Sequence, residues 1–169
     1  SLNTAIGERA LEDNTTGARN TSVGVVTLKS NTTGVNNVGI GNGALYANTT
    51  GGLNTAVGYK SLNANTTALN NVAVGEKTML LNTTGDTNTA VGTKTLYSNT
   101  TGANNTVTGA FSLYANTTGT ENTAVGKNVL SANTTGSYNI GVGSYALNSN
   151  ITGDNNVAVG LNALTKNTN

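Results

Sequence analysis

Residues 88–104 read NTAVGTKTLYSNTTGAN, and this unit decides the fold because it recurs along the whole chain. A copy begins every 17 residues, with no insertion or deletion, and a fixed period of this kind indicates a repeat protein. We number the positions of one copy 1 to 17, and the consensus is N-T-A-V-G-x-x-A-L-x-x-N-T-T-G-x-x. The ten copies begin at Asn3, Asn20, Asn37, Asn54, Asn71, Asn88, Asn105, Asn122, Asn139 and Asn156.

Five positions of the repeat hardly change. Positions 1 and 12 are always Asn, and position 5 is always Gly. Position 9 is Leu except at Met79, and position 15 is Gly except at Ala68. Each copy is therefore expected to adopt the same local conformation.

The first five positions predict a short strand. Residues 71–75 show the pattern, since Val72 and Val74 share one face and Ala73 lies on the other. A helix is disfavoured, because Gly at positions 5 and 15 would each cost about 1 kcal/mol in a helix interior. We expect the β-branched residues of positions 2 and 4 to point inward with Leu of position 9, and a second strand over positions 8–11.

The remaining invariant residues predict corners and ladders. Gly at position 5 permits a positive φ, and Asn-Thr-Thr-Gly at positions 12–15 is typical of a turn. Stacked coils of equal length place Asn on Asn, so that each amide bonds to its copy above and below. The expected ladder residues are Asn54, Asn71, Asn88, Asn65, Asn82, Asn99, Leu62, Leu96 and Leu113.

The fold expected is therefore all-β: a parallel β-solenoid (β-roll) of ten 17-residue coils that forms one repeat array over residues 1–169. We expect a segment of a longer fibre, because neither end carries a distinct cap. Each coil is expected to bury only three apolar side chains, and the free energy gained by this burial is small compared with the conformational entropy lost when 17 residues are ordered. We therefore expect further burial in a homotrimer, with the small third-position column near the threefold axis.

Composition argues against catalysis. The chain has no His and no Cys, which nucleophilic triads and zinc sites need. The seven acidic residues do not share one repeat position, so neither paired carboxylates nor a metal ladder is expected. We expect no enzyme activity, no metal and no cofactor.

Charge and hydropathy limit the partners. Charged residues are 9% of the chain, against about a quarter in a typical domain. The net charge of +1 is too low to indicate nucleic-acid binding, which needs positive charge to neutralise phosphates. No apolar run approaches the ~20 residues of a membrane span, so we expect no membrane insertion by this segment.

Residues 70–75 and 155–160 both read NNVAVG, which resembles the NSVAIG signature of trimeric autotransporter adhesin heads. The full 17-residue unit more closely resembles the repeat shafts of phage tail-fibre-like proteins, which often end in an endosialidase-type chaperone domain. The resemblance covers essentially the whole chain and implies a left-handed, trimeric β-roll. The adhesin-head repeat is usually shorter than 17 residues.

Tyrosines are the candidate contact residues, for a host surface glycan or for a seam between chains. Lys60, Lys77 and Lys94 share position 7 of three successive coils and form a stripe suited to an acidic glycan or to a solvated edge. The tyrosines are Tyr46, Tyr97 and Tyr114 at position 10, with Tyr59, Tyr138 and Tyr145 elsewhere.

These observations predict an extracellular structural or adhesive fibre shaft, of a phage tail fibre on the virion or of an adhesin on a bacterial surface. The alternative is an ice-binding solenoid, because regular Thr arrays can order water. The adjacent Thr-Thr pair disfavours that alternative, since a flat ice face needs two outward Thr columns at i and i+2.

Overall fold

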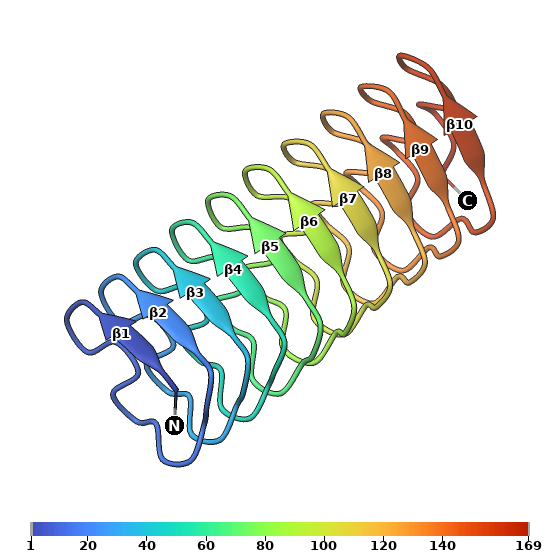
Figure 1. Ribbon diagram of the computed structural model, residues 1–169. Coiled ribbons are helices and arrows are strands. Elements are labelled where there is room, and N and C mark those ends of the chain that lie inside the picture. The colour runs from blue at the N-terminus through green and yellow to red at the C-terminus, as the bar shows by residue number, and fades with distance from the viewer. Residues whose placement is uncertain (1, 169) are drawn as a thin grey trace.

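The structure, a computed structural model, describes residues 2–168 as a stack of coils with one short strand each (Figure 1). The strands form a single parallel sheet in chain order, from the N-terminal to the C-terminal end of the rod. They are β1 (Thr4–Ile6), β2 (Thr21–Val23), β3 (Val38–Ile40), β4 (Thr55–Val57), β5 (Val72–Val74), β6 (Thr89–Val91), β7 (Thr106–Thr108), β8 (Thr123–Val125), β9 (Ile140–Val142) and β10 (Val157–Val159).

The register confirms the predicted parallel β-solenoid. Each strand pairs with the residues one repeat further on, so that Ala56 lies beside Ala73 and Val57 beside Val74. Neighbouring strands of a sheet lie about 4.8 Å apart, which gives the ten coils a length of about 45 Å. Equal coil length thus converts a sequence period into columns of like residues along a rod.

The second strand predicted over positions 8–11 is wrong. In the fourth coil, residues 59–64 are turns. Lys60 at position 7 and Leu62 at position 9 have left-handed φ values of 52° and 49°, which a β-strand does not contain. The turns still bond between coils, because the N–H of Lys60 donates to Asn42 O at 2.9 Å and that of Leu62 donates to Thr78 O at 3.0 Å.

The invariant Gly of position 5 makes the predicted corner. Gly58 has a φ of 127°, and a Cβ placed on it would lie 2.5 Å from the carbonyl oxygen of Gly75 in the next coil. Both the backbone conformation and the close approach of the neighbouring coil exclude any side chain at this position.

The strand faces the interior with its small residue, which reverses the predicted orientation. Ala56, Ala73 and Ala90 at position 3 are fully buried, whereas positions 2 and 4 point outward. Leu of position 9 fills the interior from the opposite side of the coil, for example Leu62 and Leu96. The third-position column therefore lies inside each coil and cannot line an axis between chains.

The interior is narrow enough that small residues are locally obligatory. A Cβ on Gly39 would lie 2.7 Å from Cγ2 of Thr27, and one on Gly141 would lie 2.4 Å from Cγ1 of Val129. In both places a β-branched residue at position 8 faces a Gly at position 3 of the next coil. At these two places the contact with the preceding coil leaves no room for a Cβ at position 3.

Two asparagine ladders run through the stack, as predicted. At position 1, Asn71 Nδ2 donates to Gly85 O at 2.9 Å, and Asn71 Oδ1 accepts from the backbone N–H of Asn88 at 2.9 Å. At position 12, Asn82 Nδ2 donates to Asn65 Oδ1 at 3.2 Å and to Gly85 O at 3.0 Å. Within residues 2–168, every buried side-chain nitrogen or oxygen has a hydrogen-bond partner.

Replacing one ladder residue tests how much the stack depends on it. Asn71→Ala leaves the buried N–H of Asn88 without an acceptor, and we expect it to lower the free energy of unfolding by about 1–3 kcal/mol. Chemical denaturation followed by circular dichroism measures this. Asn42→Ala is the control, because Asn42 is exposed and Ala110 already stands at the same position. Equal effects of both substitutions would contradict the ladder's role.

Candidate functional site

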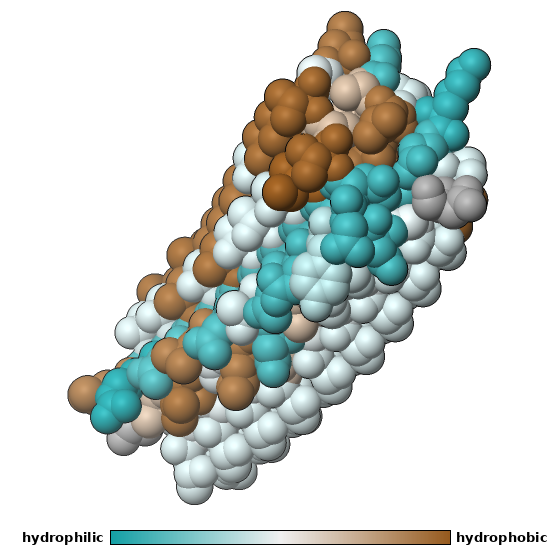
Figure 2. Space-filling view, turned by 90° about the vertical axis from the view of Figure 1, so that its right-hand side faces the viewer, coloured by the Kyte–Doolittle hydropathy of each residue, from teal (hydrophilic) through white to brown (hydrophobic). Residues whose placement is uncertain are grey.

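Two outward surfaces of the rod differ in their chemistry, and the first is the strand face, made by positions 2 and 4. Position 4 is Val or Ile in every coil except at Thr108, and neither position carries a charge in any coil. Ile40 and Val125 are about 40% exposed. In Figure 2 apolar side chains run along the left edge of the rod, where the strands lie, and gather at the top over the C-terminal coil.

The second surface is the variable face, made by positions 6, 7 and 10, and it contains most of the predicted tyrosines. The rings of Tyr97 and Tyr114 stack with centroids 5.0 Å apart. Phe111 joins them, with its centroid 6.2 Å from that of Tyr114. Stacking of successive coils thus brings two predicted tyrosines together with Phe111, which was not among the predicted contact residues.

The predicted lysine stripe lies on the same face and contacts aromatic rings. The Nζ atoms of Lys60 and Lys77 lie 5.4 and 5.7 Å from the ring centroid of Tyr59. Lys94 Nζ lies 5.8 Å from the ring of Phe111. These are cation–π distances, so the rings hold the ammonium groups in place along the face.

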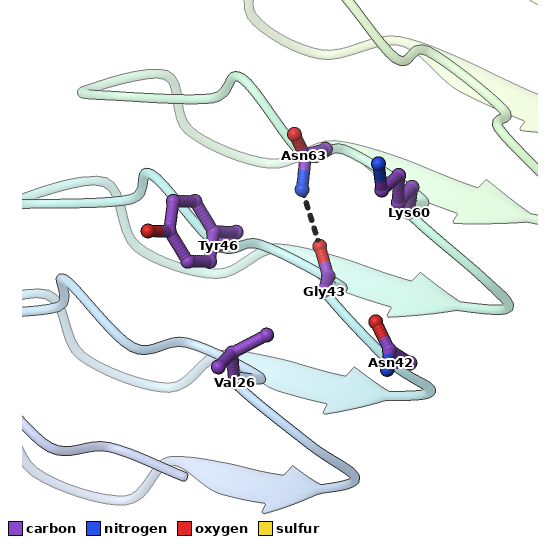
Figure 3. A pocket seen from close by; sticks show the side chains of 6 residues that line it. All are labelled: Val26, Asn42, Gly43, Tyr46, Lys60 and Asn63. Atoms are coloured by element: carbon purple, nitrogen blue, oxygen red, sulfur yellow. Dashed lines mark hydrogen bonds between the residues drawn. The ribbon is translucent and has the colours of Figure 1, made fainter. Parts of the chain in front are cut away.

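A hollow of about 200 Å³ opens on the variable face next to this stripe (Figure 3). It exists because Gly43 lacks a side chain at position 7, where every other coil has one. Asn63 Nδ2 donates to Gly43 O at 2.8 Å and so closes the floor of the hollow. The lining residues are Val26, Asn42, Gly43, Tyr46, Lys60 and Asn63.

Two predicted tyrosines lie apart from these groups. Tyr138 is the most exposed tyrosine, at 59%, and occupies position 17, outside the variable face. Tyr145 lies on the variable face at position 7, two coils beyond Phe111. Neither ring stacks on another ring within the described part of the chain.

The sequence contains one signal for the hollow: Gly43 is the single Gly at position 7.

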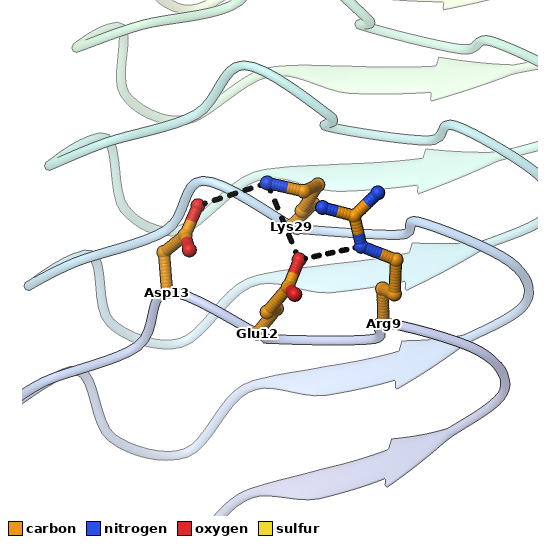
Figure 4. A network of polar contacts seen from close by, with 4 residues as sticks. All are labelled: Arg9, Glu12, Asp13 and Lys29. Atoms are coloured by element: carbon orange, nitrogen blue, oxygen red, sulfur yellow. Dashed lines mark hydrogen bonds and ion pairs between the residues drawn. The ribbon is translucent and has the colours of Figure 1, made fainter.

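A charged network occupies the first two coils (Figure 4). Glu12 Oε2 accepts from Arg9 Nε at 2.8 Å, and Lys29 Nζ lies 3.3 Å from Glu12 and 3.2 Å from Asp13. Glu12 and Asp13 lie in the turns formed by residues 8–13, and both contact Lys29 of the next coil. The hydrogen bond from Arg9, followed by that from Lys29, holds the pKa of the Glu12 carboxyl below its usual value.

The lowered pKa of Glu12 determines in which direction the stability contributed by this network changes with pH. A carboxyl whose folded pKa is depressed contributes stability above its unfolded pKa and loses it as pH falls through the folded pKa. We expect an NMR titration of Glu12 to show a midpoint below that of an ordinary glutamate. Arg9→Gln should raise this midpoint, whereas Arg19→Gln, which changes a cation outside the network, should leave it unchanged. The effect on stability should be small, since the pair is exposed.

Threonines form one outward column at position 14, exposed in Thr50, Thr67 and Thr84. Those of position 13 use their hydroxyls within the stack, as Thr66 Oγ1 donates to Thr83 O at 3.2 Å. On the strand face, only Thr106 and Thr108 provide threonine at both i and i+2. The outward threonines therefore do not form two adjacent columns.

Other kinds of site find no support among residues 2–168. They contain no group of three or more His, Cys, Asp or Glu side chains arranged to hold a metal ion. Nor do they contain a helix that is long and apolar enough to cross a membrane.

No family model, curated protein or solved structure matches this chain.

Proposed function

We propose that this chain is the rod-like shaft of an extracellular fibre, in a phage tail fibre or a bacterial surface adhesin. One observation carries the proposal: the Asn columns of positions 1 and 12 and the Leu column of position 9 are almost constant in all ten coils and positions 3 and 8 keep short side chains, while the variable face changes from coil to coil. A protein that keeps its stacking constant and varies one long surface is suited to hold a shape and to display contact groups.

A glycan array and a freezing-point measurement test this role against its alternatives. We expect the protein to bind a subset of host or bacterial surface glycans and to release them chemically unchanged. We expect no thermal hysteresis at millimolar concentration, because the outward threonines lack the paired columns that an ice face needs. Hysteresis would favour ice binding, cleavage of a glycan would favour an enzyme, and binding to no surface glycan would remove the adhesive part of the proposal.

The strand face supports a homotrimer, with an interface that differs from the one the sequence predicted. It is uncharged along all ten coils and carries Val or Ile at position 4 in every coil except at Thr108, whereas soluble monomers rarely expose long contiguous apolar surfaces. Copies of the chain have the same rise per coil, so their strand faces meet in register around an axis parallel to the rod. Three copies around such an axis let each strand face contact both neighbours.

Charge placed on the strand face should separate the chains. The triple variant Val57→Lys, Val74→Lys and Val91→Lys changes outward side chains, and we expect it to sediment as a monomer while the unchanged protein sediments as a trimer. Thr50→Lys, Thr67→Lys and Thr84→Lys adds the same charge to the position-14 column and should leave the trimer intact. A monomeric unchanged protein would contradict the proposal, and dissociation by the control variant would place the interface elsewhere.

A further inference from the structure

We propose that coils three to six of the variable face bind a carboxylate-bearing polysaccharide, whose chain lies along the rod. This inference rests on the adhesive role proposed above and names the ligand class and its site. The site combines the hollow at Gly43 with the row formed by Lys60, Lys77 and Lys94.

The hollow has the chemistry of a sugar subsite. The ring of Tyr46 forms one wall, and aromatic rings stack on the apolar faces of sugars (Figure 3). Asn42 is exposed, and its side-chain amide makes no hydrogen bond to the described residues. Asn63 uses its Nδ2 to bond Gly43 O, which leaves its Oδ1 available as an acceptor. The hollow thus combines an aromatic ring for stacking, one amide and one free acceptor oxygen. Its volume of about 200 Å³ is of the order of one sugar ring.

The lysine row supplies a charge that is only partly neutralised. Lys77 lies 3.5 Å from Glu76, whereas Lys60 and Lys94 have no ion-pair partner among residues 2–168. The acids Asp86 and Asp154 stand at position 16, off the variable face, where they accept hydrogen bonds from backbone N–H groups. Positive charge therefore concentrates on one side of the middle coils, although the whole chain carries a net charge of only +1.

The spacing of the row favours a polymer with regularly repeated carboxylates. Residues of one column repeat about every 4.8 Å, and like charges so close repel one another. A uronic-acid polymer carries one carboxylate per sugar and so provides counter-charges at a comparable repeat. Lysine rows with aromatic rings also suit single-stranded nucleic acid, but the amide-lined hollow has room for only one ring and the net charge is low.

Isothermal titration calorimetry with a short oligogalacturonate tests the charge requirement. The triple variant Lys60→Gln, Lys77→Gln and Lys94→Gln should weaken binding about tenfold, which corresponds to about 1.4 kcal/mol. The control variant Arg19→Gln, Lys127→Gln and Lys166→Gln removes the same charge outside the site and should change the affinity less than about twofold. Raising the salt concentration should weaken binding by the unchanged protein, because exposed charges are screened.

A second variant tests the hollow without changing charge. Gly43→Asn places in the hollow a side chain that position 7 already holds elsewhere, since Asn128 and Asn162 have φ values of 54° and 58° there. We expect an unchanged melting curve and severalfold weaker binding of oligogalacturonate. Unchanged affinity would remove the hollow from the site.

Three further results would overturn the inference. Equal binding of the methyl-esterified oligosaccharide would show that the carboxylates are not recognised. Equal losses in the lysine-row variant and its control would show that only overall charge matters. Tighter binding of an oligothymidylate would assign the face to single-stranded nucleic acid.

A glycan array, compared with the calorimetry, separates the polysaccharide site from the adhesive role. If the unchanged protein binds neutral glycans there but no oligogalacturonate in solution, the adhesive role stands and the ligand class proposed here is wrong. If it binds neither, both the adhesive role and this site are wrong.

Discussion

Hydrogen bonding between identical residues of successive coils is the interaction on which the whole structure depends. The side chain of Asn71 reaches the carbonyl oxygen of Gly85 and receives the backbone N–H of Asn88, and the same pattern repeats at every coil from Asn20 to Asn139. The pattern requires an amide, because one side chain must both donate and accept. A carboxylate lacks the donor, and an alanine lacks both groups.

This constraint accounts for the unusual composition. The core of each coil is small, with one Leu or Met and short side chains from positions 3 and 8, so apolar burial per residue is modest. Backbone bonds between coils and the two amide ladders satisfy the polar groups that a thin coil would otherwise leave buried and unpaired. Of the inward positions, 1, 9 and 12 are consequently almost invariant and 3 and 8 keep short side chains, whereas charged and aromatic residues stand only at positions that face outward.

The strand face and the variable face differ in charge and side-chain chemistry, and the proposed function assigns a different role to each. The strand face is uncharged and nearly uniform, as expected of a surface that meets copies of itself. The variable face carries lysines, aromatic rings and one hollow, as expected of a surface that meets a polar ligand. A rod with a shared face for assembly and a separate face for contact can perform both tasks at once.

The sequence by itself determined the period, the parallel stacking in register, the corner at Gly58 and its copies, and the asparagine ladders. It could do so because like residues recur every 17 positions and stack on one another. Alternation within residues 71–75 showed that the strand has two unlike faces, but not which of them is interior. Tertiary structure decided that: position 3 faces the Leu column across a narrow interior, where the side chains are short, as at Ala73, and Val107 is the largest of the column. The hollow at Gly43 and the contact of Lys77 with Tyr59 also required the fold, because they join side chains of different coils and positions, whose separation depends on the left-handed turns after each strand.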